Sequence, residues 1–179
     1  MGEKTGNILE EAITFLTDGE FNLKKTSNKD VIVYTIIVER SEYGKVCGAK
    51  GKTIRAIKHL WEACIARKLK KPIIVTLKEP TGGYAKGRSA DVPAENFNQD
   101  EYLELVEDVL NLICHTTAKD HGSGGGLIPH DPKGYNVYIS MDDPPDYLKQ
   151  EFYESANVLF QAMAKANGGN VSIHFPDLF

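Results

Sequence analysis

A stretch rich in glycine, proline and asparagine, residues 80–98, constrains the fold of this chain more than any other feature. These residue types favour turns over helices and strands, and roughly twenty residues without periodic apolar positions are unusual inside one compact domain. We therefore predict a linker over residues 81–98. It would separate a first domain, residues 1–80, from a second domain, residues 99–179.

The first half alternates helical and extended sequence patterns, which predicts an α+β fold. Apolar residues recur at helical spacing after Asn7, a good N-cap residue, and the pattern stops at Gly19. The β-branched run from Val31 to Val38 predicts a strong strand, paired in a hairpin with a weaker strand around Phe21. The expected elements are a helix at 7–18, strands at 21–23 and 31–38, a short helix at 41–46, a longer helix at 52–68 and a strand at 73–77.

The second half also mixes helical and extended patterns. Its expected elements are a helix at 99–114, a long glycine-containing loop, a strand at 135–141, a helix at 145–166 and a strand at 171–175. This order of elements resembles that of the first half, although the residues themselves do not match. The second half is therefore either an unrelated acidic α/β domain or a degenerate repeat of the first.

The two halves carry opposite charge, although the whole chain has a formal net charge of only -4. Residues 1–88 hold 17 lysines and arginines against 10 acidic residues, whereas residues 89–179 hold 4 against 15. The most basic segment is 40–71, with ten basic and two acidic side chains. A local excess of this kind attracts phosphate whatever the total charge. A solvated lysine-rich surface is the alternative explanation.

Composition excludes several classes of protein. No apolar run approaches the roughly 20 residues that span a bilayer, and the first residues lack a signal-peptide core. We therefore expect a cytoplasmic protein without a membrane partner. The three cysteines are far apart and form no CxxC pair, so neither disulfides nor a zinc site is expected.

The most informative local motif is the four-residue loop Gly48-Ala49-Lys50-Gly51, which follows a strand and a short helix and precedes a long helix. Two glycines three residues apart allow a sharp turn and leave no Cβ to obstruct an approaching chain. The free amides at the start of the following helix favour anions, and Lys50 and Lys52 add positive charge. This pattern predicts a loop that holds phosphates without covalent chemistry.

The segment Val46 to Ile54 resembles the hallmark of KH-type RNA-binding domains, V-I-G-K-x-G-x-x-I, with Cys47 in place of the usual isoleucine. The order of strand, short helix, GxxG loop, long helix and strand is also that of the family. Because the additional helix and strand come first, the resemblance is to the type II form, typical of small prokaryotic single-KH proteins. It covers about residues 7–79. The second half would then be a degenerate KH-like repeat or an unrelated domain.

The resemblance implies non-catalytic binding of single-stranded RNA, in which the GxxG loop clamps the backbone of about four nucleotides and the bases enter an apolar groove. Single-stranded DNA is the alternative ligand. No cofactor or metal is implied. The residues that the resemblance assigns to RNA binding are Gly48, Ala49, Lys50 and Gly51 in the loop, Lys45, Lys52 and Arg55 along the backbone path, and Val46 and Cys47 at or under the groove, together with Ile54.

Two enzyme hypotheses compete with RNA binding. Gly51-Lys52-Thr53 matches the end of a P-loop, but the glycine that a P-loop requires five residues earlier is Val46 here. A second enzyme hypothesis is metal ligation by one loose set of side chains, Cys114, His115, Asp120, His121, His130 and Asp131. Their spacing does not match a known metal site, so solvated loop histidines are the better explanation. We expect no enzymatic activity.

The remaining alternative is an interaction or regulatory protein in which the acidic second half binds a partner and the KH-like half is a scaffold. An acidic surface can dock onto a basic surface of the same chain, of another copy or of another protein. The strands expected at 31–38 and 171–175 also offer edges for a homodimer.

Overall fold

The computed structural model describes residues 2–18, 20–80, 97–120 and 134–175 of the chain. The first half contains one sheet and a series of helices. Its elements are α1 (Gly2–Leu16), β1 (Phe21–Ser27), β2 (Ile32–Val38), α2 (Tyr43–Cys47), a 3-10 turn (Ala49–Gly51), α3 (Lys52–Lys58), a π-helical segment (His59–Ile65), α4 (Ala66–Leu69) and β3 (Ile73–Leu77). Helical backbone therefore continues from Lys52 to Leu69, which confirms the long helix expected there.

The second half has a similar sequence of elements. They are α5 (Gln99–Asn111), β4 (Thr116–Asp120), β5 (Gly134–Met141), α6 (Gln150–Ala166) and β6 (Asn170–His174). The α+β class is thus confirmed. The region expected as a linker lies outside the described residues from 81 to 96, while Phe97 is buried and Asn98 caps α5 by accepting the amide of Glu101 at 3.2 Å.

Both sheets have the same topology. In the order β1-β2-β3 the first pair is antiparallel and the second parallel, and the order β4-β5-β6 repeats this arrangement. Each parallel pair is joined by a helical crossover, as parallel strands require. β2 alternates buried and half-buried residues and lies between its neighbours, so it is not the free edge expected for dimerisation, whereas β6 is an edge strand.

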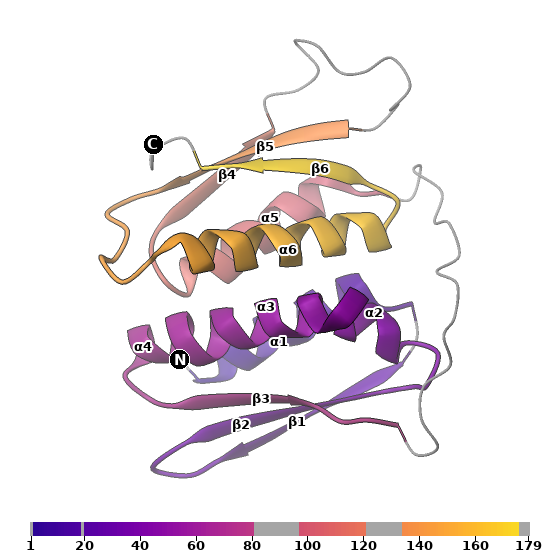
Figure 1. The fold of residues 1–179 in the computed structure, drawn as a ribbon. Coiled ribbons are helices and arrows are strands. Elements are labelled where there is room, and N and C mark those ends of the chain that lie inside the picture. Colours follow the sequence, from indigo (N-terminus) through magenta and orange to yellow (C-terminus); the bar gives the residue numbers. More distant parts are fainter. Residues whose placement is uncertain (1, 19, 81–96, 121–133, 176–179) are drawn as a thin grey trace.

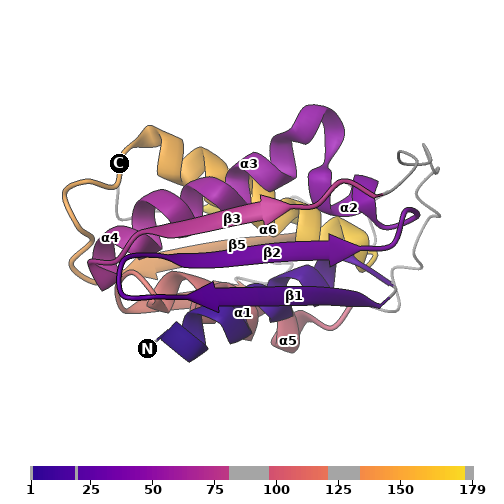
Figure 2. The same cartoon turned by 90° about the horizontal axis from the view of Figure 1, so that it is seen from below.

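The helices lie between the two sheets (Figure 1), so that the order of layers is sheet, helices, helices, sheet. α6 packs on α1 and α3, and α5 packs on α1. Seen from below (Figure 2), the first sheet is in front of α1 and α5. The buried apolar residues of both halves form one continuous cluster, with Trp61 and Tyr102 among its largest fully buried side chains. The halves therefore share a core.

The buried positions of the helices match between the halves at a shift in numbering that is constant within each pair of helices, 97 for α1 and α5 and 99 for the helical run after the GxxG loop and α6. On α1 the buried apolar residues run from Ile8 to Leu16, and the same spacing recurs from Leu105 on α5 to Ile113 just after it. The helical run after the GxxG loop and α6 correspond in the same way. The matched pairs are Ile57 with Ala156, Leu60 with Leu159, Trp61 with Phe160, Cys64 with Met163 and Ile65 with Ala164.

Two buried hydrogen bonds follow the same correspondence. Trp61 Nε1 donates to the carbonyl of Thr5 at 3.4 Å, and Tyr102 Oη donates to the carbonyl of Phe160 at 2.8 Å. The shift that relates Ile8 to Leu105 also relates Thr5 to Tyr102. The two bonds thus join equivalent positions in opposite directions, which ties the matching helices of each half in the same way.

Three expectations about element boundaries were wrong. α1 begins at Gly2, so Asn7 lies inside the helix and is not its N-cap. Its early inward positions are Thr5 and Gly6, and a Cβ on Gly6 would lie 3.1 Å from the ring of Tyr34. A small residue is therefore needed there, and the apolar pattern starts only afterwards.

The other two wrong boundaries are in the second half. The long loop expected after α5 contains β4, whose buried residues, Thr116 and Ala118, are too weakly apolar to indicate a strand. α6 begins at Gln150 and not near Pro145. Asp143 has a left-handed backbone with φ of 51°, and the residue before a proline disfavours helical conformation.

Candidate nucleic-acid interface

The GxxG loop is a tight turn between α2 and α3. The amide of Gly48 donates to the carbonyl of Gly44 at 2.9 Å and ends α2, and the amide of Gly51 donates to the carbonyl of Gly48 at 3.1 Å and closes the turn. Positive φ angles occur at Gly48 (77°), Lys50 (55°) and Gly51 (72°). A non-glycine residue in this region carries backbone strain, which here falls on Lys50.

The two glycines are required for different reasons. A Cβ on Gly48 would lie 2.3 Å from Oγ1 of Thr53 and 2.8 Å from its backbone nitrogen, closer than side-chain carbons approach other atoms. A Cβ on Gly51 would have open space, with Ile54 Cγ2 nearest at 4.0 Å. Gly48 thus lets α2 and α3 pack closely, whereas Gly51 serves the backbone conformation alone.

The loop presents positive charge to solvent. Ala49, Lys50, Lys52 and Arg55 are exposed. The guanidinium of Arg55 donates from Nη2 to the carbonyl of Lys50 at 3.0 Å and from Nε to the carbonyl of Gly51 at 3.3 Å. Because Arg55 occupies these two carbonyls, it fixes the turn. This holding role of Arg55 was not predicted, although its four-residue separation from Gly51 on a helix is compatible with it.

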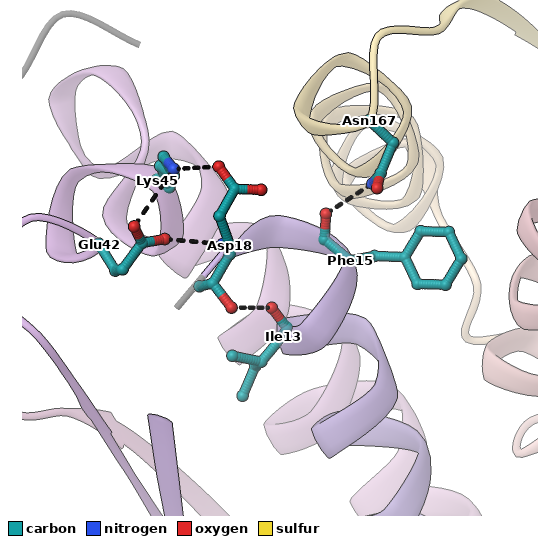
Figure 3. Close-up of polar contacts among 7 residues, drawn as sticks. Ile13, Phe15, Asp18, Glu42, Lys45 and Asn167 are labelled. Atoms are coloured by element: carbon teal, nitrogen blue, oxygen red, sulfur yellow. Dashed lines mark hydrogen bonds and ion pairs between the residues drawn. The ribbon is translucent and has the colours of Figure 1, made fainter. Parts of the chain in front are cut away.

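Lys45 is already held by two carboxylates (Figure 3). Its Nζ lies 2.8 Å from Oδ2 of Asp18 and 3.3 Å from Oε1 of Glu42, and Glu42 also accepts the backbone amide of Asp18 at 3.0 Å. Burial acts to lower the pKa of Lys45, but the hydrogen bonds to Asp18 and Glu42 outweigh it and raise that pKa. Glu42 is itself buried. These contacts fasten α2 to the end of α1.

The apolar residues assigned to the groove differ in exposure. Val46 is completely buried, so it supports α2 from inside the core and does not form a surface. Cys47 and Ile54 are half-buried beside the loop. Burial raises the pKa of a different thiol, Cys64, to about 11, so this cysteine is a core side chain.

Metal binding and membrane insertion gain no support in the described parts of the chain. Within them no group of three potential ligands is close enough to hold a metal ion, and His115 pairs with Asp142 at 2.8 Å. Three of the ligands considered, His121, His130 and Asp131, lie outside the described residues. None of the described helices combines the length and apolarity needed to cross a bilayer.

Comparisons with known proteins add little to this description. No protein-family model matches the chain. The chain is similar to Serpin-Z2B of Oryza sativa subsp. japonica, with 32% identity over 97 residues that cover 50% of this chain and 22% of the serpin. The matched stretch is thus less than a quarter of the serpin, and neither comparison bears on nucleic-acid binding.

Proposed function

We propose that the first half is a type II KH domain that binds single-stranded RNA without catalysis. The observation that supports this most directly is the turn from Gly48 to Gly51, which has an unusual backbone and an exposed basic surface at the start of a long helix. Such a turn leaves the main chain accessible to a sugar-phosphate backbone. Single-stranded DNA is the ligand that an experiment must distinguish from RNA.

The element order is compatible with this proposal. Helix, two strands, short helix, GxxG turn, long helix and strand follow one another from α1 to β3, in the order that the family resemblance implies. On the basis of the same resemblance, we interpret the second half as a degenerate repeat of the first. Its sheet topology and buried helix positions match the first half, but Asp142 to Lys149, before α6, contain no GxxG turn.

The contacts of each residue suggest different roles within the interface. Lys50 and Lys52 are exposed and close to the turn, so we assign them to phosphate contacts. Arg55 holds the turn through the carbonyls of Lys50 and Gly51, and its exposed guanidinium adds positive charge beside the turn. Lys45 and Val46 act as positioning residues, because the first is paired with carboxylates and the second is buried.

The decisive experiment replaces both exposed loop residues, Ala49→Asp and Lys50→Asp, and measures binding of short random-sequence RNA and DNA over a series of salt concentrations. We expect affinity to fall by about tenfold or more and the salt dependence to become shallower, because phosphate contacts are lost. A control with the same charge change, Asn22→Asp and Lys29→Asp, alters exposed residues outside the loop. Equal binding by the folded loop variant and the wild type would refute the proposal.

A further inference from the structure

A hollow of about 370 Å³ opens on the second half, between the first turns of α6 and the end of β6. Aromatic rings form much of its wall. Tyr138 and His174 are stacked, with ring centroids 4.8 Å apart and planes at 20°, and Tyr153 meets Phe175 edge to face at 5.1 Å. Rings in these arrangements offer flat faces on which a planar or positively charged group can lie.

Two of the polar groups that line the hollow, on Glu154 and Asn157, present acceptor oxygens. Oδ1 of Asn157 is buried and has no hydrogen-bond partner within the part of the chain that the structure describes. The carboxylate of Glu154, one turn away on the same side of α6, accepts a single side-chain bond of 3.3 Å from Gln150. An unpaired buried acceptor costs about 1–3 kcal/mol, a cost that a ligand with N–H donors would remove.

The correspondence between the halves shows what has changed at this position. The shift that relates Ile57 to Ala156 also relates Arg55 to Glu154 and Lys58 to Asn157. Two cationic side chains of the first half are thus replaced by a carboxylate and an amide. Residues 89–179 hold 4 basic residues against 15 acidic ones, so the surroundings repel phosphate as well.

We propose that this hollow binds the arginine side chain of a basic segment in a partner protein. A guanidinium is planar and always charged, it stacks on aromatic faces, and it can donate to Glu154 and Asn157 at the same time. Lysine carries the charge but lacks the planar group that lies flat on a ring and donates to two acceptors at once. The site includes the positions equivalent to Arg55 and Lys58 of the first half but has the opposite charge preference, and it does not depend on RNA binding by the first half.

The test uses the full chain labelled with ¹⁵N and three blocked amino acids as probes: N-acetyl-arginine amide, the same derivative of lysine, and the same derivative of citrulline, a neutral analogue of arginine. We expect saturable amide shifts at Tyr153, Glu154 and Asn157, with arginine binding roughly fivefold more tightly than citrulline or lysine. The shifts at the GxxG loop should be negligible, because that surface is itself basic.

Two variants on α6 separate the hollow from general electrostatics. Glu154→Gln keeps the shape of the side chain and should weaken arginine binding about fivefold. Glu151→Gln removes the same charge from a neighbouring residue that does not line the hollow, and should change binding less than twofold if the effect is local. An Asn157→Leu variant, checked for folding by its spectrum, should also lose the preference for arginine.

Several results would overturn the proposal. Equal binding of citrulline and arginine would indicate stacking without recognition of charge. Equal effects of Glu151→Gln and Glu154→Gln, or shifts confined to other acidic surfaces, would indicate nonspecific attraction. Absence of saturable shifts with the arginine probe would show that the hollow is not an arginine site. If only an RNA oligonucleotide shifts Tyr153 and Asn157, the hollow binds nucleic acid instead.

Discussion

The side-chain amide of Asn167, which follows α6, donates a hydrogen bond of 2.7 Å to the backbone carbonyl of Phe15 in the last turn of α1 (Figure 3). The same amide donates to the carbonyl of Met163 at 2.8 Å. One side chain thus satisfies a terminal carbonyl on each of two helices from different halves. Helix ends leave such carbonyls without partners inside the helix, so the contact stabilises both ends.

Replacement of Asn167 by alanine should lower the free energy of unfolding by about 1–2 kcal/mol, because two part-buried carbonyls lose their donor. Urea denaturation followed by Trp61 fluorescence and by far-UV circular dichroism would measure it. The two signals should coincide, since Trp61 lies in the core shared by both halves. Gln150→Ala, at an exposed position, is the control. Separate transitions for the two signals would contradict a shared cooperative unit.

The two loop glycines should differ in their tolerance of alanine. Gly48→Ala should cost more than about 2 kcal/mol, because it combines positive φ with a clash against Thr53, whereas Gly51→Ala should cost only about 1 kcal/mol from its backbone conformation. Gly44→Ala, in open space within a helix, should be neutral or slightly stabilising. Thermal denaturation of the three variants tests this ranking. Equal losses at Gly48 and Gly51 would argue against close packing of α2 on α3.

Substitutions at Lys45 and Lys52 should have different effects, the first on the stability of the fold and the second on affinity for RNA. Lys45→Gln should destabilise the protein, by at most about 1 kcal/mol for a part-exposed pair, because Asp18 and Glu42 lose their partner. Lys52→Gln, at an exposed position, should leave stability unchanged but reduce affinity for RNA and the slope of its salt dependence by about one charge. Denaturation and RNA titration of both variants would check this. The reverse pattern would reassign Lys45 to the interface.

An acidic hollow of about 330 Å³ lies between α1 and α5, and its lining includes Glu11, Glu104 and Asp108. Burial raises the pKa of Glu11, and Asp108 and Glu104 raise it further. The pKa of Asp108 is also raised, first by burial and then by Glu104, although Lys4 opposes the shift. The folded protein therefore binds protons at these carboxyl groups more readily than the unfolded chain does.

Asp108→Asn should consequently stabilise the protein at pH 7, where the wild-type carboxylates repel one another. A raised folded-state pKa destabilises above that pKa, and the penalty disappears as pH falls below the ordinary value of 3.8. The advantage of the variant should thus shrink as the pH falls through the raised pKa of Asp108 towards the ordinary value of 3.8. Denaturation curves at several pH values would measure it. A constant difference, or one shared by the exposed control Asp146→Asn, would exclude the carboxylate cluster as its source.

The sequence predicts much of the first half because its strongest signals are local. The β-branched run gave the central strand β2, and the spacing of Gly48 and Gly51 gave the turn between two helices. The pattern does not predict β4, because Thr116 and Ala118 carry little apolar surface and their amides donate to side chains, with Ala118 donating to Glu107 at 2.8 Å. A short strand of this kind depends on the neighbouring helix, which no local pattern reports.

The arrangement of the halves could not be predicted from local patterns either. A helix that packs only on one sheet needs an apolar stripe on one side, and a wider apolar surface indicates a second contact. The sequence does not say which element makes that second contact. The ion pairs of Lys45 could not be predicted in full either, because one of them depends on how the helices pack. Its pairing with Glu42, three residues away in the sequence, is predictable from helical spacing. Asp18 follows a different helix, so only tertiary packing brings it close to Lys45.

The placement of both helical layers between the sheets affects how the chain can fold during synthesis. α1 and α3 pack on α6, which is synthesised long after α1, because α1 ends at Leu16 and α6 begins at Gln150. At roughly 5–20 residues per second, α1 waits on the order of ten seconds before its partner helices exist. Until then the apolar face of α1 lacks the helices that cover it in the folded protein, and transiently exposed surface of this kind favours aggregation during synthesis.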